Sequence, residues 1–148
     1  MSATKSAIGP YLTETHAISK RRAIFDDSGV VAYLYLTAPG TDEHVADAWV
    51  YNRIPAPAPS EVSRFLPDPP PAAEGYTSDH AFCKDPTGRR WYLLWSRDGD
   101  SVALLDNAGP VACIVSGRKN GYSRDLIRSG PWGDPWSHSV YVQTFGVT

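Results

Sequence analysis

Short runs of apolar, β-branched and aromatic residues, of the length of β-strands, follow one another along this chain and are separated by polar turns. Over residues 89–96 large apolar side chains fall on both faces, which predicts a central strand covered on both sides. The pattern predicts about eight strands, at residues 22–25, 30–37, 45–52, 79–84, 89–96, 101–105, 111–116 and 138–145.

Residues 45–52 allow two interpretations. Trp49 and Tyr51 share one strand face with Val45, which favours a strand. Ala46 and Ala48 suit a helix, so a helix is the alternative.

The signature Asp-x-x-Gly occurs three times, at residues 26–29, 85–88 and 106–109. Asp at the first position bonds the backbone ahead of it, and Gly at the fourth accepts a positive φ. Each copy therefore predicts a β-hairpin. The surrounding stretches 23–32 and 103–112 share five residues in register, which indicates either an internal duplication or the narrow residue choice of one turn class.

Residues 55–71 contain seven of the 13 prolines, and proline lacks the N–H that a central strand requires. This segment is therefore a loop, either a crossover within one domain, which we favour, or an interdomain linker. Residues 60–66 suit a short helix inside it, with Ser60 as N-cap and with Phe65 and Leu66 packed on the body of the domain.

The predicted fold is mainly β or α+β, a single antiparallel sheet-based domain with a meander of hairpins and one or two short helices. We expect an N-terminal arm at residues 1–20. The β-rich domain then covers residues 21–148 and includes a proline-rich crossover loop at residues 55–73.

Composition narrows the function classes. The chain has 148 residues, a net charge of −2 and no apolar run that resembles a signal peptide or a membrane span. A chain of this charge offers no general attraction to nucleic acid, and its two cysteines form neither a disulfide framework nor a metal motif. We expect a cytoplasmic protein without a cofactor, a bound metal, a nucleic-acid partner or a membrane partner.

Several segments together carry a family resemblance, namely residues 24–29, 33–35, 47–52, 95–99, 103–105 and 121–124. They look like the acidic turn, aromatic strand, Asp-Ala strand and later segments of a bacterial family catalogued as domain of unknown function 2251. The chain departs from that pattern at Ser28, at Trp49, where we expect His, and at Ser123, where we expect Cys. The resemblance implies one fold and brings no established activity.

Catalytic motifs are weak in this sequence. No two of the four histidines have a metal-ligand spacing, and His80 and Cys83 would point to opposite faces of a strand. Asp26 and Asp27 stand where turns recruit aspartate, although a carboxylate pair is the alternative. We expect no catalytic residue.

Residues 23–52 contain no Lys or Arg but five acidic residues, Asp26, Asp27, Asp42, Glu43 and Asp47. If the strands bring them together, they form an acidic edge that attracts a basic partner. The alternative is a pair of solvated turns.

A loop near the C-terminus places Trp132 and Trp136 among prolines and glycines. They either pack back on the sheet or stay exposed as anchors for a partner. Arg118 and Lys119 suit an anion nest or an ordinary basic loop, and Arg124 suits a structural ion pair.

The sequence supports three hypotheses about function. The first is a non-enzymatic protein-binding module, most concretely an immunity or antitoxin-like protein that neutralises a bacterial toxin, its protein partner, by binding it. The second is a small-ligand-binding β domain with a pocket lined by Tyr33, Tyr35, Trp91 and Trp95. The third is an enzyme of unrecognised type that uses Asp79, His80 or Arg124.

Overall fold

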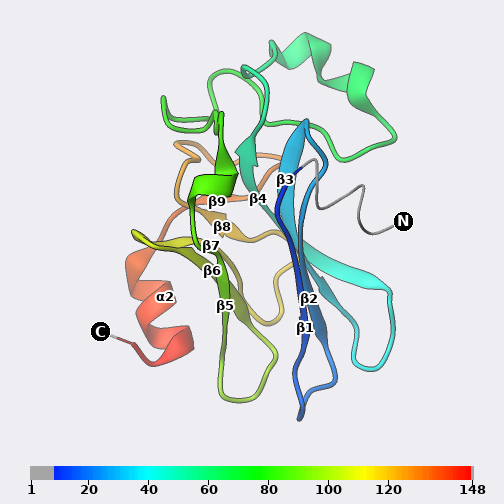
Figure 1. The fold of residues 1–148 in the computed structure, drawn as a ribbon, viewed down its shortest axis with the longest axis vertical. Helices are drawn as coiled ribbons and strands as arrows, with labels where there is room; N and C mark the ends of the chain where they lie inside the picture. Colours follow the sequence, from blue (N-terminus) through cyan, green and yellow to red (C-terminus); the bar gives the residue numbers. More distant parts are fainter. Residues whose placement is uncertain (1–8, 148) are drawn as a thin grey trace.

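The computed structural model describes residues 9–147, which form two packed β-sheets with a helix beside the second sheet (Figure 1). The first sheet has the order β1-β2-β3-β4, and the second has the order β5-β6-β7-β8-β9. All strand pairs are antiparallel except β8 and β9. The strands are β1 (Tyr11–Thr15), β2 (Arg22–Asp27), β3 (Val31–Thr37), β4 (His44–Asn52), β5 (Tyr92–Trp95), β6 (Val102–Asp106), β7 (Gly109–Ile114), β8 (Tyr122–Ser123) and β9 (Asp134–Pro135). The prediction of a mainly β or α+β fold is confirmed.

Two of the three predicted hairpins are present. Gly29 has a φ of 92° in the turn between β2 and β3, where the side chain of Asp27 accepts a hydrogen bond from its N–H at 2.7 Å. Gly109 has a φ of 127° at the turn between β6 and β7. There the side chain of Asp106 accepts a hydrogen bond from the N–H of Ala108 at 2.8 Å. Left-handed torsions at these glycines reverse the chain as the signature predicts.

The hairpin predicted at residues 85–88 is wrong. These residues include a short 3₁₀ helix, η2 (Pro86–Gly88), in which Asp85 caps the N–H of Thr87. Gly88 has no positive φ, and residues 79–84 form no strand beyond a single bridge between Asn52 and Phe82. Proline at the first helical position favours the helical turn over the reversal.

The main core lies between the two sheets. Alternate residues of each sheet point inward, and Phe25, Leu34, Leu104 and Ile114 are buried there. Burying each such side chain contributes roughly 1.5–3 kcal/mol before entropy is subtracted.

β5 is an edge strand, so the prediction of a central strand is wrong, although both of its faces are partly covered. Trp91, Leu93 and Trp95 pack on the main core, but Tyr92 on the other face remains 47% exposed. β5 has bulky residues on both faces because one face packs on the main core and the other faces the C-terminal helix. On that second face, Leu94 packs in the same cluster as Tyr141.

The strand predicted at residues 138–145 is wrong, because this segment is the helix α2 (His138–Phe145). Ser137 caps it by accepting the N–H of Val140, and Gly146 ends it with a φ of 67°. These are the ordinary start and stop signals of a helix. Tyr141 packs on Ala103 and Cys113, so α2 covers the face of the second sheet that points away from the first.

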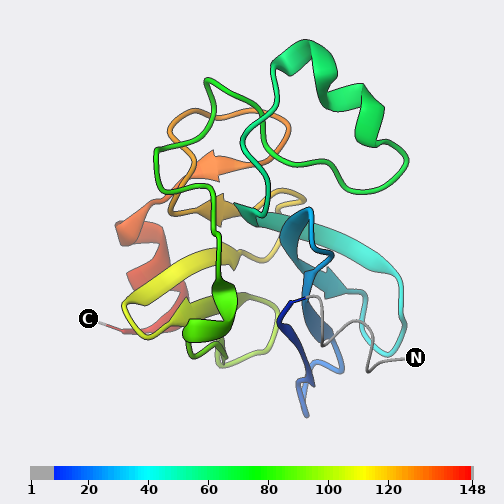
Figure 2. The ribbon, with the colours of Figure 1, turned by 45° about the horizontal axis from the view of Figure 1, so that its top comes forward.

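The proline loop, residues 55–73, crosses over within one fold. It contains a 3₁₀ helix, η1 (Pro59–Phe65), as predicted, but Ala58 rather than Ser60 occupies the N-cap. Leu66 is 58% exposed and does not pin the loop to the body; the buried Ala72 and Ala73 do so instead. Figure 2 shows this loop, in green, far from α2 with its helical turn on the outside.

Part of the stretch predicted as an N-terminal arm belongs to the first sheet, because β1 pairs with β2 along its whole length. Residues 1–8 of that arm lie outside the described residues. The two sheets also meet through hydrogen bonds at the free edge of β4. There the N–H of Asp47 donates to Lys119 at 2.9 Å, and its carbonyl accepts from Gly121 at 2.8 Å.

Candidate binding groove

The outer face of the first sheet, which points away from the main core, carries polar and aromatic side chains. The register pairs Asp26 on β2 with Tyr33 on β3, and Tyr35 on β3 with Asp47 on β4. Because side chains alternate across a strand, these four residues share one face.

Aromatic rings form a row on this face. The rings of Tyr33 and Tyr35 lie 5.8 Å apart at 16°, and those of Tyr35 and His44 lie 4.5 Å apart at 26°. The hydroxyl of Tyr33 donates to the carbonyl of Pro70 at 2.6 Å, and the indole N–H of Trp132 donates to the same carbonyl at 3.3 Å. The proline loop is thereby held against the end of the row.

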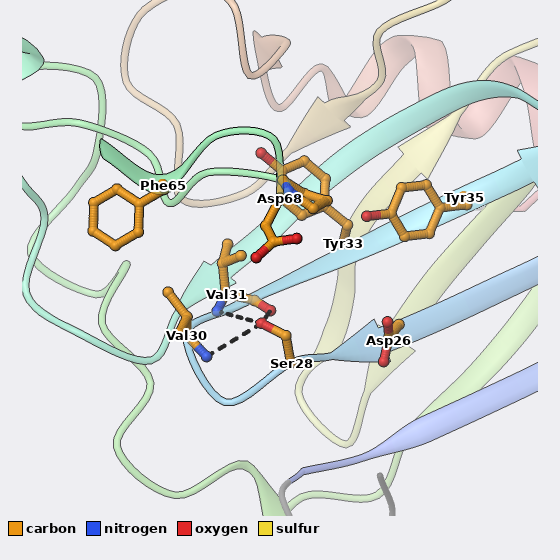
Figure 3. A pocket seen from close by; sticks show the side chains of 9 residues that line it. Asp26, Ser28, Val30, Val31, Tyr33, Tyr35, Phe65 and Asp68 are labelled. Atoms are coloured by element: carbon orange, nitrogen blue, oxygen red, sulfur yellow. Dashed lines mark hydrogen bonds between the residues drawn. The ribbon is translucent and has the colours of Figure 1, made fainter. Parts of the chain in front are cut away.

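Two adjoining cavities open between this row and the proline loop, with volumes of about 360 and 370 Å³. Both are lined by Tyr33, Tyr35, Asp68 and Pro69, and we call them together the groove. Figure 3 shows Asp68 reaching down from the proline loop toward the tyrosines, with Asp26 on the neighbouring strand.

The walls of the groove are acidic. Asp26 lines the first cavity, Asp47 lines the second, and Asp68 lines both. No Lys or Arg of residues 9–147 lines either cavity. The groove therefore presents carboxylates and phenol rings together, a combination that attracts cations.

Asp47 occupies the inner part of the groove. Its side chain is half-buried, and burial raises the pKa of its carboxyl above the usual value, although the nearby His44 opposes that shift. Burial and the charges of Asp47 and Asp26 also raise the pKa of Tyr35, so its phenol stays neutral. No hydrogen bond or ion pair joins the Asp47 carboxylate to another described residue. The site thus holds a carboxylate that lacks a permanent cationic partner within the described chain.

The five acidic residues predicted to form one edge are separated by the fold. Asp42 and Glu43 lie in the turn after β3, at the opposite end of that strand from Asp26 and Asp27. Seven strand residues span about 20 Å, so the two turns form no common surface.

Asp27 has a structural position. It is fully buried and accepts hydrogen bonds from the hydroxyl of Tyr51 at 2.7 Å and from Arg53 at 2.8 Å. Asp42 pairs with Arg22. Of the five acidic residues, Asp26 and Asp47 reach the groove.

The loop tryptophans pack back on the fold, which was one of the two alternatives. Trp132 is buried against Tyr76 and its cluster, and Trp136 is half-buried against Tyr141. Trp132 also lines the second cavity, so it contributes to the buried floor of the groove and is not an exposed anchor.

Of the three basic residues at positions 118, 119 and 124, the two arginines form ion pairs. Arg118 pairs with Asp134 and lies over the ring of Tyr122. A guanidinium nitrogen of Arg124 lies 3.6 Å from a carboxylate oxygen of the buried Asp106, which is the structural ion pair that the sequence suggests. Lys119 is exposed beside Arg118 and lines neither cavity of the groove, although its carbonyl accepts the N–H of Asp47.

The pocket predicted from Tyr33, Tyr35, Trp91 and Trp95 does not form, because the two tryptophans pack on the main core. Tyr33 and Tyr35 line the groove with carboxylates instead. For the enzyme hypothesis, the cavity that Asp79 lines includes neither His80 nor Arg124, so the three residues do not meet in that cavity.

Asp68 is the groove residue that sequence reasoning missed. It stands between Pro67 and Pro69, and a lone acid among prolines gave no periodic signal. Only the path of the loop over Tyr33 brings it to the tyrosines.

No group of three or more His, Cys, Asp or Glu side chains gathers around a common metal position within residues 9–147. None of the helices described there has the length and apolar character of a membrane span. No protein-family model, curated protein or solved structure matches this chain. The resemblance to the family of unknown function 2251 stays a prediction.

Proposed function

We propose that this protein is a non-enzymatic binding module that holds a positively charged segment of a partner protein in the groove. Its most concrete form is a cytoplasmic immunity or antitoxin-like protein that neutralises a bacterial toxin with a basic surface. One observation carries the proposal: Asp26, Asp47 and Asp68 surround an aromatic floor, and no described Lys or Arg lines the groove.

The charge arrangement supports binding of a cationic surface in two ways. Carboxylates steer a basic partner toward the groove before contact. Phenol rings and a half-buried carboxylate then favour a cation that gives up part of its hydration.

The decisive experiment is co-purification with a toxin-like protein encoded next to this gene, at low and high salt. We expect a complex at low salt that Asp68→Lys weakens strongly. Glu43→Lys is the matched control, because both residues are exposed acids and Glu43 lies at the far end of β3. Equal weakening by the two variants would contradict groove recognition, and the absence of any complex would contradict the inhibitor role.

A small-ligand-binding β domain is the second candidate, favoured by the cavity volumes of about 360 and 370 Å³. Such volumes fall in the range of small-molecule sites. Native mass spectrometry of the protein purified from its own cells separates the two functions, since a retained small cation supports this second one.

A further inference from the structure

We infer that the part of the groove between Asp47 and Asp68 receives one arginine side chain of the partner, with the guanidinium directed toward Asp47. This inference depends on the proposed function and specifies the group that the groove recognises.

The second cavity is graded from an open rim to a closed floor. At the rim, Leu66 is 58% exposed and Asp68 is exposed. At the floor, Tyr33 is 7% and Trp132 is 6% exposed, and Asp47 is half-buried. A ligand that fits this gradient is long, has an apolar stem and ends in a cation.

The rim and walls suit the stem. Val62, Leu66 and Pro67 line this cavity from the proline loop, and together they offer an apolar surface for three methylene groups. An inorganic cation or a short amine leaves this surface without a partner. A basic side chain covers it.

The floor suits the head group. Asp47 presents a carboxylate that no described side chain neutralises by a direct ion pair, and the hydroxyl of Tyr35 bonds no other described residue. A guanidinium offers five N–H donors in a planar fork that matches a carboxylate bidentately. It is also less strongly hydrated than an ammonium, so it enters a half-buried place at lower desolvation cost. These properties favour arginine over lysine.

Four acetylated and amidated pentapeptides test the inference, each with two glycines on either side of a central arginine, citrulline, lysine or norleucine. Their dissociation constants are measured by NMR titration of the ¹⁵N-labelled protein, with the amides of Tyr35 and Asp47 as reporters. Citrulline keeps the shape of arginine without its charge. We expect the arginine peptide to bind at least about tenfold more tightly than the citrulline peptide, which is the effect of one charged hydrogen-bonded pair.

Protein variants complete a double-mutant cycle. Asp47→Asn should abolish the arginine-over-citrulline preference, and Asp68→Asn should reduce it less because Asp68 is exposed at the rim. Asp42→Asn, at the other end of β3, should leave the arginine-over-citrulline preference unchanged. A preference that survives Asp47→Asn overturns the inference.

The remaining outcomes separate this inference from the proposed function. Equal binding of the lysine and arginine peptides overturns the assignment of arginine and leaves a cation-selective groove in place. Equal binding of the arginine and citrulline peptides, with a partner complex still weakened by Asp68→Lys, also overturns the inference alone. Arginine preference in the peptides with a partner complex insensitive to Asp68→Lys contradicts the proposed function instead.

Discussion

Asn52 accepts the indole N–H of Trp49 with its side-chain oxygen at 2.9 Å, and the same oxygen accepts the backbone N–H of Ala72 at 2.9 Å. Its side-chain nitrogen donates to the carbonyl of Ala72, also at 2.9 Å. All of these groups are buried. One amide therefore joins the end of β4 to the end of the proline loop.

Asn52→Ala should lower the free energy of unfolding by about 3 kcal/mol or more, because it leaves the buried Trp49 N–H and both backbone groups of Ala72 without partners. Urea denaturation measures the change. Asn107→Ala is the control, since Asn107 is exposed in a turn and its side-chain oxygen accepts one 3.3 Å hydrogen bond, from the backbone N–H of Arg90. A loss at Asn52 no larger than that at Asn107 would contradict this account of the loop anchor.

Asp47→Asn should stabilise the fold at neutral pH. Burial raises the pKa of Asp47 in the folded state, so its protonated form favours folding, and this contribution is lost as pH rises through the folded-state pKa. Asparagine has no charge to desolvate. The melting temperature of the variant should exceed that of the wild type above that pKa, and the difference should shrink at lower pH.

Asp68→Asn serves as the control for Asp47→Asn, because Asp68 is exposed and carries no such burial. Its melting temperature should follow the wild type across the same pH range. If Asp47→Asn melts lower at neutral pH, the carboxylate stabilises the fold and its place in a binding site loses support.

Tyr51→Phe should destabilise the protein by about 1–3 kcal/mol, because the buried Asp27 loses a hydrogen bond of 2.7 Å and keeps Arg53. Thermal and urea unfolding measure the change. Tyr92→Phe removes the same hydroxyl at a side chain that is 47% exposed, and it should leave stability nearly unchanged. Similar effects at the two positions would refute the importance of the buried network.

Gly109→Ala and Gly88→Ala form a matched pair. A Cβ at either position meets open space, but only Gly109 has a positive φ, of 127°. Alanine at position 109 should cost about 1–3 kcal/mol in backbone strain, whereas alanine at position 88 should be neutral or stabilise by up to about 1 kcal/mol. Equal effects in urea denaturation would show that the hairpin does not need the left-handed torsion.

The turn residues predict the hairpins at Gly29 and Gly109 correctly. At both places the strands on either side of the turn pair with each other. The same signature at Gly88 follows residues that never pair as a strand, so Pro86 and the Asp85 cap turn it helical. A local sequence pattern identifies a turn, but it does not show whether the segments on either side of the turn pair as strands.

The sequence prediction and the structure also differ at the C-terminal helix and at the groove, for two separate reasons. Residues 138–145 contain β-branched and aromatic residues that are typical of strands, yet Ser137 and Gly146 cap them at either end as a helix. The groove depends on contacts between residues far apart in sequence, such as the bond from Tyr33 to Pro70. The sequence predicts binding roles for Tyr33 and for Asp47 separately, but only the path of the loop brings both of them to Asp68.

The tethering of the proline loop has a consequence for binding kinetics. Its base is closed by a 2.8 Å hydrogen bond from Glu74 to Pro57, and Pro70 and Ala72 are tied to the first sheet. The groove beside Asp68 is consequently preorganised, and the protein loses little conformational entropy when a ligand binds there. Association should then proceed as a single fast phase without a slow rearrangement of the protein.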